Sequence, residues 1–288
     1  NGGVLPMITS CSPGWISYCE KFYPEFIPNL SSCKSPHEMT GAVVKSYFAE
    51  KAGIDPKSIY VVSVMPCTAK KYEAKRPELS EGGLPDVDAV LTVRELARMI
   101  KQSGIDYARL PDEDFDPMLG ESTGASVIFG ATGGVMEAAL RTAYFTLKGE
   151  NPPADAFKAV RSGGFQENAG VQEAEFAIGD IKLRTAAVSG LGNTRRLLQQ
   201  IERGEVHYDF VEVMACPGGC VGGGGQPIHD GEERAFTRGR KLYALDAKAK
   251  LRYSHENPDI REIYSDFFGK PMSHKAHMLL HTEHWKNK

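Results

Sequence analysis

The sequence lacks three features that would place the chain in large classes of protein. No apolar run approaches the roughly 18 to 20 residues that a membrane-spanning helix needs, so no membrane span is predicted. Charge of one sign is not in excess, with 34 Lys and Arg against 37 Asp and Glu, so nucleic acid is not an expected partner. Cysteine is sparse, at six in 288 residues, which disfavours a disulfide-stapled secreted domain.

The composition that remains is that of a folded protein. Hydrophobic residues make up 41 % of the chain and charged residues 25 %, enough for one large core or two smaller lobes. We expect a soluble protein, in the cytoplasm rather than the periplasm. The sequence begins with Asn1 instead of Met, so we also expect a segment upstream of it.

Strand and helix patterns alternate along the chain, which indicates α/β layers. Strands are predicted over residues 4–9, 58–65, 86–93 and 208–214, with a hairpin over 174–188. Helices are predicted over 13–23, 36–53, 95–102, 134–147 and 193–204, and in the tail over 257–269 and 271–284. Residues 106–132 form a long irregular connection, a length that is typical of functional loops.

Four cysteines lie in Pro- and Gly-rich loops that follow predicted strands: Cys11, Cys67, Cys216 and Cys220. The carboxyl ends of strands in such sheets converge on binding sites, and loops of this kind present thiolates to soft metals. Structural zinc is the first alternative, but it favours CxxC pairs, and the CxxxC of Cys216 and Cys220 has no matching second pair. Cys19 and Cys33 are predicted to be small buried thiols.

The residues around these cysteines add three features. Gly222–Gly225 carries no side chains, so its backbone can approach a bulky ligand closely, whereas a P-loop would need a Lys-Ser/Thr that is absent. Lys70 either brings an ammonium beside Cys67 or is a solvated surface lysine. Met65 and Met214 each precede a cysteine by two residues and either pack in the core or contact a metal cofactor.

Three segments resemble the active-site signatures of the [FeFe]-hydrogenases, which are TSCCPGW, MPCxxKxxE and ExMxCxxGCxxGGGxP. They stand here as Thr9–Trp15, Met65–Glu73 and Glu212–Pro227, and the intervening Phe129–Arg141 also looks like the family. The resemblance covers residues 1–230 as a catalytic domain. Residues 231–288 resemble the small subunit that two-subunit members carry as a separate chain.

The resemblance implies a fold of two lobes of twisted, mostly parallel sheet flanked by helices, with the cofactor between them and an extended helical tail. The implied cofactor is a [4Fe–4S] cubane joined through a cysteine sulfur to a diiron unit with CO, cyanide and a bridging dithiolate. The implied activity is the reversible reduction of protons to H2. The implied partners are a ferredoxin or cytochrome, maturation proteins, and an electron-transfer subunit or upstream module, because no CxxCxxC run for an accessory cluster is present.

The resemblance also implies roles residue by residue. Cys67, Cys216 and Cys220 fall on cubane ligands, and Cys220 is the bridging one. Lys70 falls on the donor to a cyanide, Cys11 on the thiol that passes protons, and Ser31 on a proton-pathway hydroxyl. The remaining residues implied to contact the cofactor are Met65, Pro66, Phe129, Met214, Gly224, Gln226 and Pro227.

One departure affects the ligand set. Ser12 stands where the family has the second cysteine of TSCCPGW, a cubane ligand, so the four expected thiolates are reduced to three. The cubane is then ligated by Ser12, incomplete, or held by another residue; in an alternative register Cys11 is the ligand. A non-catalytic relative, such as an iron–sulfur assembly factor or prelamin A recognition factor-like protein, and a hydrogen sensor are the rival functions. Cys11, Lys70 and Gly222–Pro227 favour catalysis.

Four tail histidines are spaced to share one face of a helix: His274, His277, His281 and His284. This stripe is either a zinc or copper site or a set of ordinary surface or interface histidines.

Overall fold

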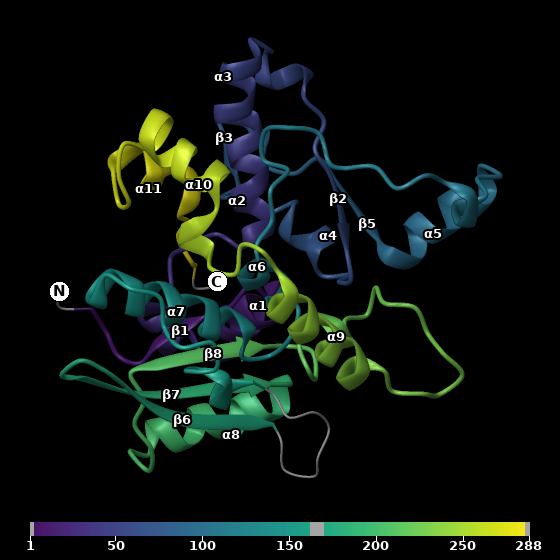
Figure 1. The fold of residues 1–288 in the computed structure, drawn as a ribbon. Coiled ribbons are helices and arrows are strands. Elements are labelled where there is room, and N and C mark those ends of the chain that lie inside the picture. Colours follow the sequence, from purple (N-terminus) through teal and green to yellow (C-terminus); the bar gives the residue numbers. More distant parts are fainter. Residues whose placement is uncertain (1–2, 162–169, 286–288) are drawn as a thin grey trace.

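The computed structural model describes residues 3–161 and 170–285. These residues form two lobes, one built on a four-stranded sheet and the other on a two-stranded sheet (Figure 1). The prediction of an α/β fold with two sheet-based lobes is therefore confirmed. None of the described helices has the length and apolar character that crossing a membrane requires.

The larger sheet has the order β1 (Met7–Thr9), β8 (Phe210–Met214), β7 (Ile181–Ser189) and β6 (Val171–Ile178). Strands β1 and β7 both run parallel to β8, whereas β6 and β7 form the predicted hairpin. The hairpin turns at Gly179, whose φ of +62° favours glycine. Strand β1 is shorter than predicted because its register with β8 covers only three residues.

Helices cover both faces of the larger sheet (Figure 1). On one face, α1 (Pro13–Phe22) and α8 (Leu191–Glu202) bury Trp15 and Leu198 against Val188 of β7. On the other face, α7 (Gly134–Lys148) packs Met136 and Leu140 against Ala187, the neighbour of Val188 in β7. Successive β7 residues therefore enter opposite cores, as the period of a strand requires.

The smaller sheet pairs β2 (Val62–Met65) with β5 (Ala89–Thr92) in parallel. Thr92 begins α5 (Val93–Gln102) with a capping box that includes Glu95. One helical segment runs through α2 (Pro36–Val43), the π-turn η2 (Val44–Phe48) and α3 (Ala49–Ala52), as predicted for 36–53. The short helix α4 (Lys70–Glu73) follows β2, and β3 (Ser80–Glu81) pairs with β4 (Leu84–Pro85).

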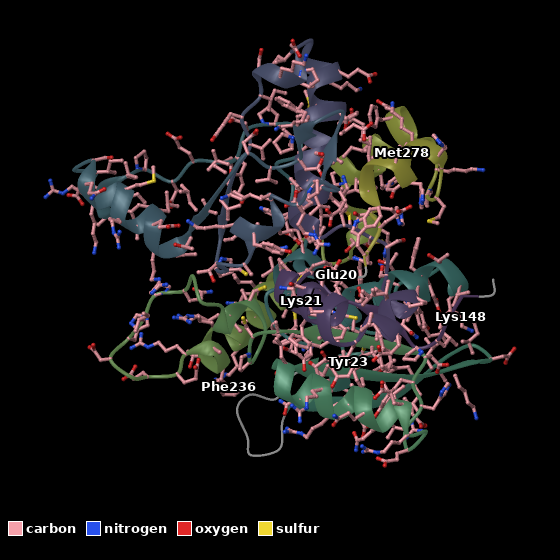
Figure 2. The ribbon with its side chains drawn as sticks, turned by 180° about the vertical axis from the view of Figure 1, so that it is seen from behind. Glu20, Lys21, Tyr23, Lys148, Phe236 and Met278 are labelled. Carbon is pink, nitrogen blue, oxygen red and sulfur yellow. The ribbon has the colours of Figure 1, made fainter. Side chains whose placement is uncertain are left out.

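The lobes are joined by a buried ion pair. The Arg76 guanidinium, which follows α4, donates to both carboxylate oxygens of Glu20 on α1, at 2.6 Å and 3.0 Å. Figure 2 shows Glu20 where the two lobes meet. The Glu20 side chain is 2 % exposed and that of Arg76 is 11 % exposed, so the pair is largely shielded from water.

The C-terminal segment is helical, as predicted. Helix α9 (Ala235–Lys248) packs on α6 (Gly124–Ile128), and the last segment forms α10 (Pro258–Ile263), η8 (Tyr264–Phe268) and α11 (His274–Leu280). These last elements lie beside α2 in Figure 1, where Phe268 packs against Tyr47. The remaining elements are single turns of 3₁₀ helix: η1 (Pro24–Asn29), η3 (Pro56–Ser58), η4 (Tyr107–Arg109), η5 (Lys158–Val160), η6 (Cys220–Gly222) and η7 (Ser254–Glu256).

Two predictions about this region are wrong. Helix α11 ends at Leu280, so His281 and His284 lie beyond the helix and the four histidines do not share one face. His281 Nδ1 instead lies 2.9 Å from Ser32 Oγ, and His284 Nε2 lies 3.0 Å from the Ser31 carbonyl. Cys33, in the same turn, is exposed rather than buried, because it lies at the surface where this turn bridges to His281. Cys19 is buried, as predicted.

Candidate active site

Three strand ends deliver the loop cysteines. Cys11 follows β1 by two residues and Cys216 follows β8 by two residues, and these strands are parallel neighbours. Ser10 Oγ donates to the Val213 carbonyl at 2.6 Å, which ties the first loop to the end of β8. Cys67 follows β2 by two residues and comes from the other lobe. The candidate site therefore forms only where the two lobes meet.

A small cavity lies between these loops. Its walls include most of the predicted site residues, which are Cys11, Ser12, Met65, Pro66, Cys67, Lys70, Met214, Cys216 and Cys220. Pro13, Ala215, Gly219 and Gly223 complete the lining. The cysteines that the sequence separates by up to two hundred residues are thus brought to one point, and all of them are free thiols.

The glycine run brings two cysteine loops into backbone contact. Gly225 N–H donates to the Pro66 carbonyl at 2.9 Å. A Cβ at Gly223 would lie 2.1 Å from that same carbonyl oxygen, and a Cβ at Gly225 would lie 2.8 Å from the Pro66 carbonyl carbon. No side chain fits at these two positions, so the predicted close approach occurs between the loops themselves.

The thiols influence one another's ionisation. A hydrogen bond from the Cys220 thiol lowers the pKa of Cys11 to about 7, although burial opposes this. The same contact, together with burial, raises the pKa of Cys220 well above its usual value. Burial and the neighbouring Cys67 raise the pKa of Cys216. These shifts place Cys11 beside Cys220 and Cys216 beside Cys67.

Lys70 is buried, with 6 % of its surface exposed, so the alternative of a solvated lysine is excluded. Its Nζ donates to Glu73 Oε2 at 2.6 Å and to the Cys11 carbonyl at 2.9 Å. An ammonium has three N–H donors, so one remains for a ligand in the cavity that Lys70 lines.

Ser12 has a structural role. It is the N-cap of α1, and its Oγ accepts from the Trp15 N–H at 3.5 Å. Its own N–H donates to Ser10 Oγ at 3.0 Å. The Ser12 hydroxyl therefore satisfies a helix terminus while its residue lines the cavity.

Five predicted site residues do not line this cavity. Gln226 Nε2 donates to the Cys220 carbonyl at 3.3 Å, and the Gly224 N–H lowers the pKa of Cys216, so both act on the cysteine loop from outside. Pro227 is exposed, and its carbonyl accepts from Arg238. Phe129 ends α6 beside that loop, and Ser31 pairs by its N–H with the Ile8 carbonyl at 2.8 Å.

Two glutamates of the site were quoted in the sequence motifs without a role. Glu73 closes the MPCxxKxxE motif and anchors Lys70. Glu212 opens the third motif, is fully buried, and accepts from the Gly133 and Met136 N–H groups at 2.7 Å each, at the start of α7. Burial raises the pKa of Glu212 to about 7. Their places in the motifs were the available signal, but spacing alone does not show which backbone groups they bind.

The donor set fits an iron–sulfur cluster. Thiols of Cys67, Cys216 and Cys220 line one cavity, with Cys11 and Ser12 on the same wall. Thiolates are the ligands that iron–sulfur clusters use, and the methionine side chains of Met65 and Met214 keep part of the wall apolar. The site can therefore hold a soft metal cluster beside a fixed ammonium.

Comparison with known proteins agrees with this chemistry. The family described as "Iron only hydrogenase large subunit, C-terminal domain" matches residues 1–224, and "Iron hydrogenase small subunit" matches residues 232–287. A variant of the [FeFe]-hydrogenase HydA1 from Chlamydomonas reinhardtii has a similar structure, with a TM-score of 0.84 and 43 % identity over 98 % of this chain and 76 % of that chain.

Curated relatives fall into two groups. The NADP-reducing hydrogenase subunit HndD of Solidesulfovibrio fructosivorans is 52 % identical over 98 % of this chain and 47 % of its own length, and iron hydrogenase 1 of Clostridium pasteurianum is 44 % identical over 99 % and 50 %. A cytosolic Fe-S cluster assembly factor, narfl of Xenopus tropicalis, is 35 % identical over 97 % and 59 %. The chain spans about half the length of these relatives. On these matches and on its site, the chain belongs to the iron-only hydrogenase family.

Proposed function

We propose that the chain is the catalytic domain of an [FeFe]-hydrogenase, which interconverts protons and electrons with H2. The observation that carries this proposal is the convergence of Cys67, Lys70 and the Cys216–Cys220 pair on one cavity with a free thiol, Cys11, at its wall. A cluster alone needs thiolates, whereas a buried ammonium and an extra thiol suit an anionic ligand and a moving proton. We further propose that the domain ends near residue 230 and that residues 231–288 act as a fused small subunit.

The proposed cofactor is a [4Fe–4S] cubane joined to a diiron unit, and when bound it supplies the two-electron redox chemistry. Cys67, Cys216 and Cys220 would hold it, with Cys220 bridging its two parts. The remaining N–H of Lys70 would donate to a cyanide. Met65, Pro66 and Met214 exclude water from the cavity, which strengthens each polar contact inside it. Cys11 would hold and pass the proton, because a thiol with a pKa near 7 is an effective acid and base.

The fourth cubane ligand is either Ser12 or Cys11. Ser12 occupies the family's ligand position, but its Oγ caps α1. Cys11 is the softer donor, and its thiol lies against that of Cys220. We retain Ser12 as the proposed ligand and Cys11 as the proposed proton relay, and the variants described below separate the two assignments.

Infrared spectroscopy tests the proposal directly. The full chain, matured with the diiron unit, should show CO and cyanide bands where protein does not absorb, and should evolve H2 with a reduced viologen. A protein that binds four irons as a cubane yet shows neither band after maturation would instead be an assembly factor of the kind to which narfl belongs. The loss of one thiolate at Ser12 is the observation that keeps this second candidate in view.

The electron partner is a separate proposal. We propose a redox protein such as a ferredoxin or cytochrome, or another subunit of a larger complex, as the name of the HndD relative suggests. Reduction of the matured chain by candidate donors, followed by the rate of H2 formation, tests this directly.

A further inference from the structure

A buried group of charged side chains lies behind Lys70 and has no role in the function proposed above. His37 and Glu38 belong to α2 and Glu73 to α4, and all three are buried. Their nitrogen and oxygen atoms approach within 4.8 Å of one another. Charged groups are rarely placed so deep without a purpose, because each must be balanced by a partner.

The contacts form a continuous chain from β2 to the first cysteine loop. His37 Nε2 lies 2.7 Å from Ser63 Oγ on β2, and His37 Nδ1 lies 3.1 Å from Glu73 Oε2. The same Glu73 oxygen accepts from Lys70 Nζ at 2.6 Å, and Lys70 Nζ also donates to the Cys11 carbonyl at 2.9 Å. Ser35 Oγ donates to Glu73 Oε2 as well, at 3.0 Å.

The charges balance only if His37 is an imidazolium. Lys70 neutralises Glu73, which leaves Glu38, whose side chain is 0 % exposed and whose two oxygens have no hydrogen-bond partner among the described residues. His37 Nδ1 lies 2.8 Å from Glu38 Oε1, so a charged ring would neutralise it. Burial alone would lower the pKa of His37, but the contacts with Glu38 and Glu73 hold it above its usual value.

Other neighbours do not supply this charge. Asp86 also faces Glu38, but it is paired with Lys34 at 2.6 Å, and Ser63 and Ser35 are neutral. A divalent cation in place of the proton is disfavoured, because the Lys70 ammonium already occupies the Glu73 oxygen that the cation would need. The ring proton is therefore the charge that completes the group.

We propose that His37 is a positioning residue: its imidazolium holds Glu73, and through Glu73 it fixes the Lys70 ammonium against the Cys11 carbonyl with the remaining N–H directed into the cavity. Only the identity of the ligand that receives this N–H, a cyanide, rests on the proposed function. The holding contacts exist in the protein without its cofactor, so they are measurable without it.

The first test uses the full chain without cofactor. The variants are His37→Gln, Glu73→Gln and the milder Ser63→Ala, with His255→Gln as the control, since His255 contacts Thr142 and Asn151 instead of this group. Acetylation of Lys70, followed by mass spectrometry, is compared with that of Lys45, a buried lysine paired with Asp88. We expect Lys70 to react several-fold faster in the first three variants, with Lys45 unchanged.

Two results of this test would overturn the proposal. One is a Lys70 rate in His37→Gln equal to that of the unaltered chain. The other is an equal acceleration of Lys45, which would show general loosening of the lobe. If His37→Gln does not fold, Ser63→Ala decides, because it removes one contact of the ring and leaves every charge in place.

The second test uses the matured protein and reads the cyanide stretching bands. We expect His37→Gln and Glu73→Gln to shift these bands in the same direction, and the double variant to shift them no further than Glu73→Gln alone, because His37 acts through Glu73. Additive shifts, or bands in His37→Gln that match the unaltered protein, would refute the role of His37. An unaltered protein without cyanide bands would refute the proposed function, while acetylation still decides the role of His37.

Discussion

Cys11 and Ser12 are adjacent in sequence but serve different neighbours. The Cys11 thiol pairs with Cys220, whereas the Ser12 hydroxyl caps α1. A one-residue difference thus separates a side chain that can exchange a proton at neutral pH from one that secures a helix. The two predictions at this scale follow from that division.

Cys11→Ala should leave the iron content of the reconstituted protein unchanged and lower H2 turnover by roughly 100-fold or more, the usual contribution of a positioned acid and base. Iron analysis and a viologen assay measure the two effects. If the variant loses cubane iron, Cys11 is a ligand, and the alternative register is the right one.

Ser12→Cys should raise iron content after reconstitution and slow cubane loss to a chelator, because a thiolate is a better cluster ligand than an alkoxide. The same change weakens the cap of α1, at a cost of about 1 kcal/mol in the free energy of unfolding. Ser273→Cys is the matched control, since Ser273 caps α11 by accepting from the Ala276 N–H. Equal iron binding by the unaltered chain and Ser12→Cys would show that residue 12 is no ligand.

Single residues were predicted well where a motif fixed their neighbours. Cys67, Cys216, Cys220 and Lys70 do line one cavity. His37 was not singled out, because its partners Ser63 and Glu73 belong to other elements and no local spacing connects them. Cys33 was misplaced for a similar reason: its surroundings depend on where the C-terminal segment docks.

At the scale of elements, the two cysteine loops are held together by backbone contact at Gly223 and Gly225. Gly223→Ala should destabilise the protein by roughly 1 to 3 kcal/mol, as overpacking usually does, and should lower iron incorporation by separating the loops. Thermal unfolding and iron analysis check both effects.

Gly192→Ala is the control for that change. A Cβ at Gly192 meets nothing within 4 Å, and the residue lies in helix α8, where alanine is favoured. The unfolding temperature of Gly192→Ala should therefore stay the same or rise. A similar loss of stability in both variants would mean that the space around Gly223 is not limiting.

Elements were predicted where local patterns are strong. Pro13 at the first position of α1 and the turn at Gly179 fixed the helix and the hairpin correctly. The ends of β1 and α11 were not predicted, because pairing with β8 limits the first and contacts with the turn at Ser31 and Ser32 replace the helix at the second. Tertiary contacts decide such ends, and no local pattern reports them.

At the scale of the whole molecule, the Arg76–Glu20 pair joins the lobes that enclose the site. Arg76→Met should lower the free energy of unfolding by roughly 3 kcal/mol, because it leaves the buried Glu20 carboxylate without its partner. Chemical denaturation measures this loss. Changing Glu20 to Gln in the same chain should recover part of it.

An exposed pair provides the comparison. Lys51 and Asp266 lie 2.9 Å apart with both side chains open to solvent, so Lys51→Met should have little effect on unfolding. If Arg76→Met is as mild as Lys51→Met, the contact between the lobes does not depend on the buried pair.

The pairing of β1 with β8 has a consequence for the order of events during synthesis. Met7 is registered with Phe210, so the strand that leads into Cys11 finds its partner only after some two hundred further residues have been made. A nascent chain that still lacks β8 also lacks Cys216 and Cys220. The ribosome must therefore release nearly the whole domain before iron can be captured, and contacts this distant in sequence form slowly. Iron delivery to this protein is a post-translational event, and translation arrested before residue 210 should yield chains that carry no cluster.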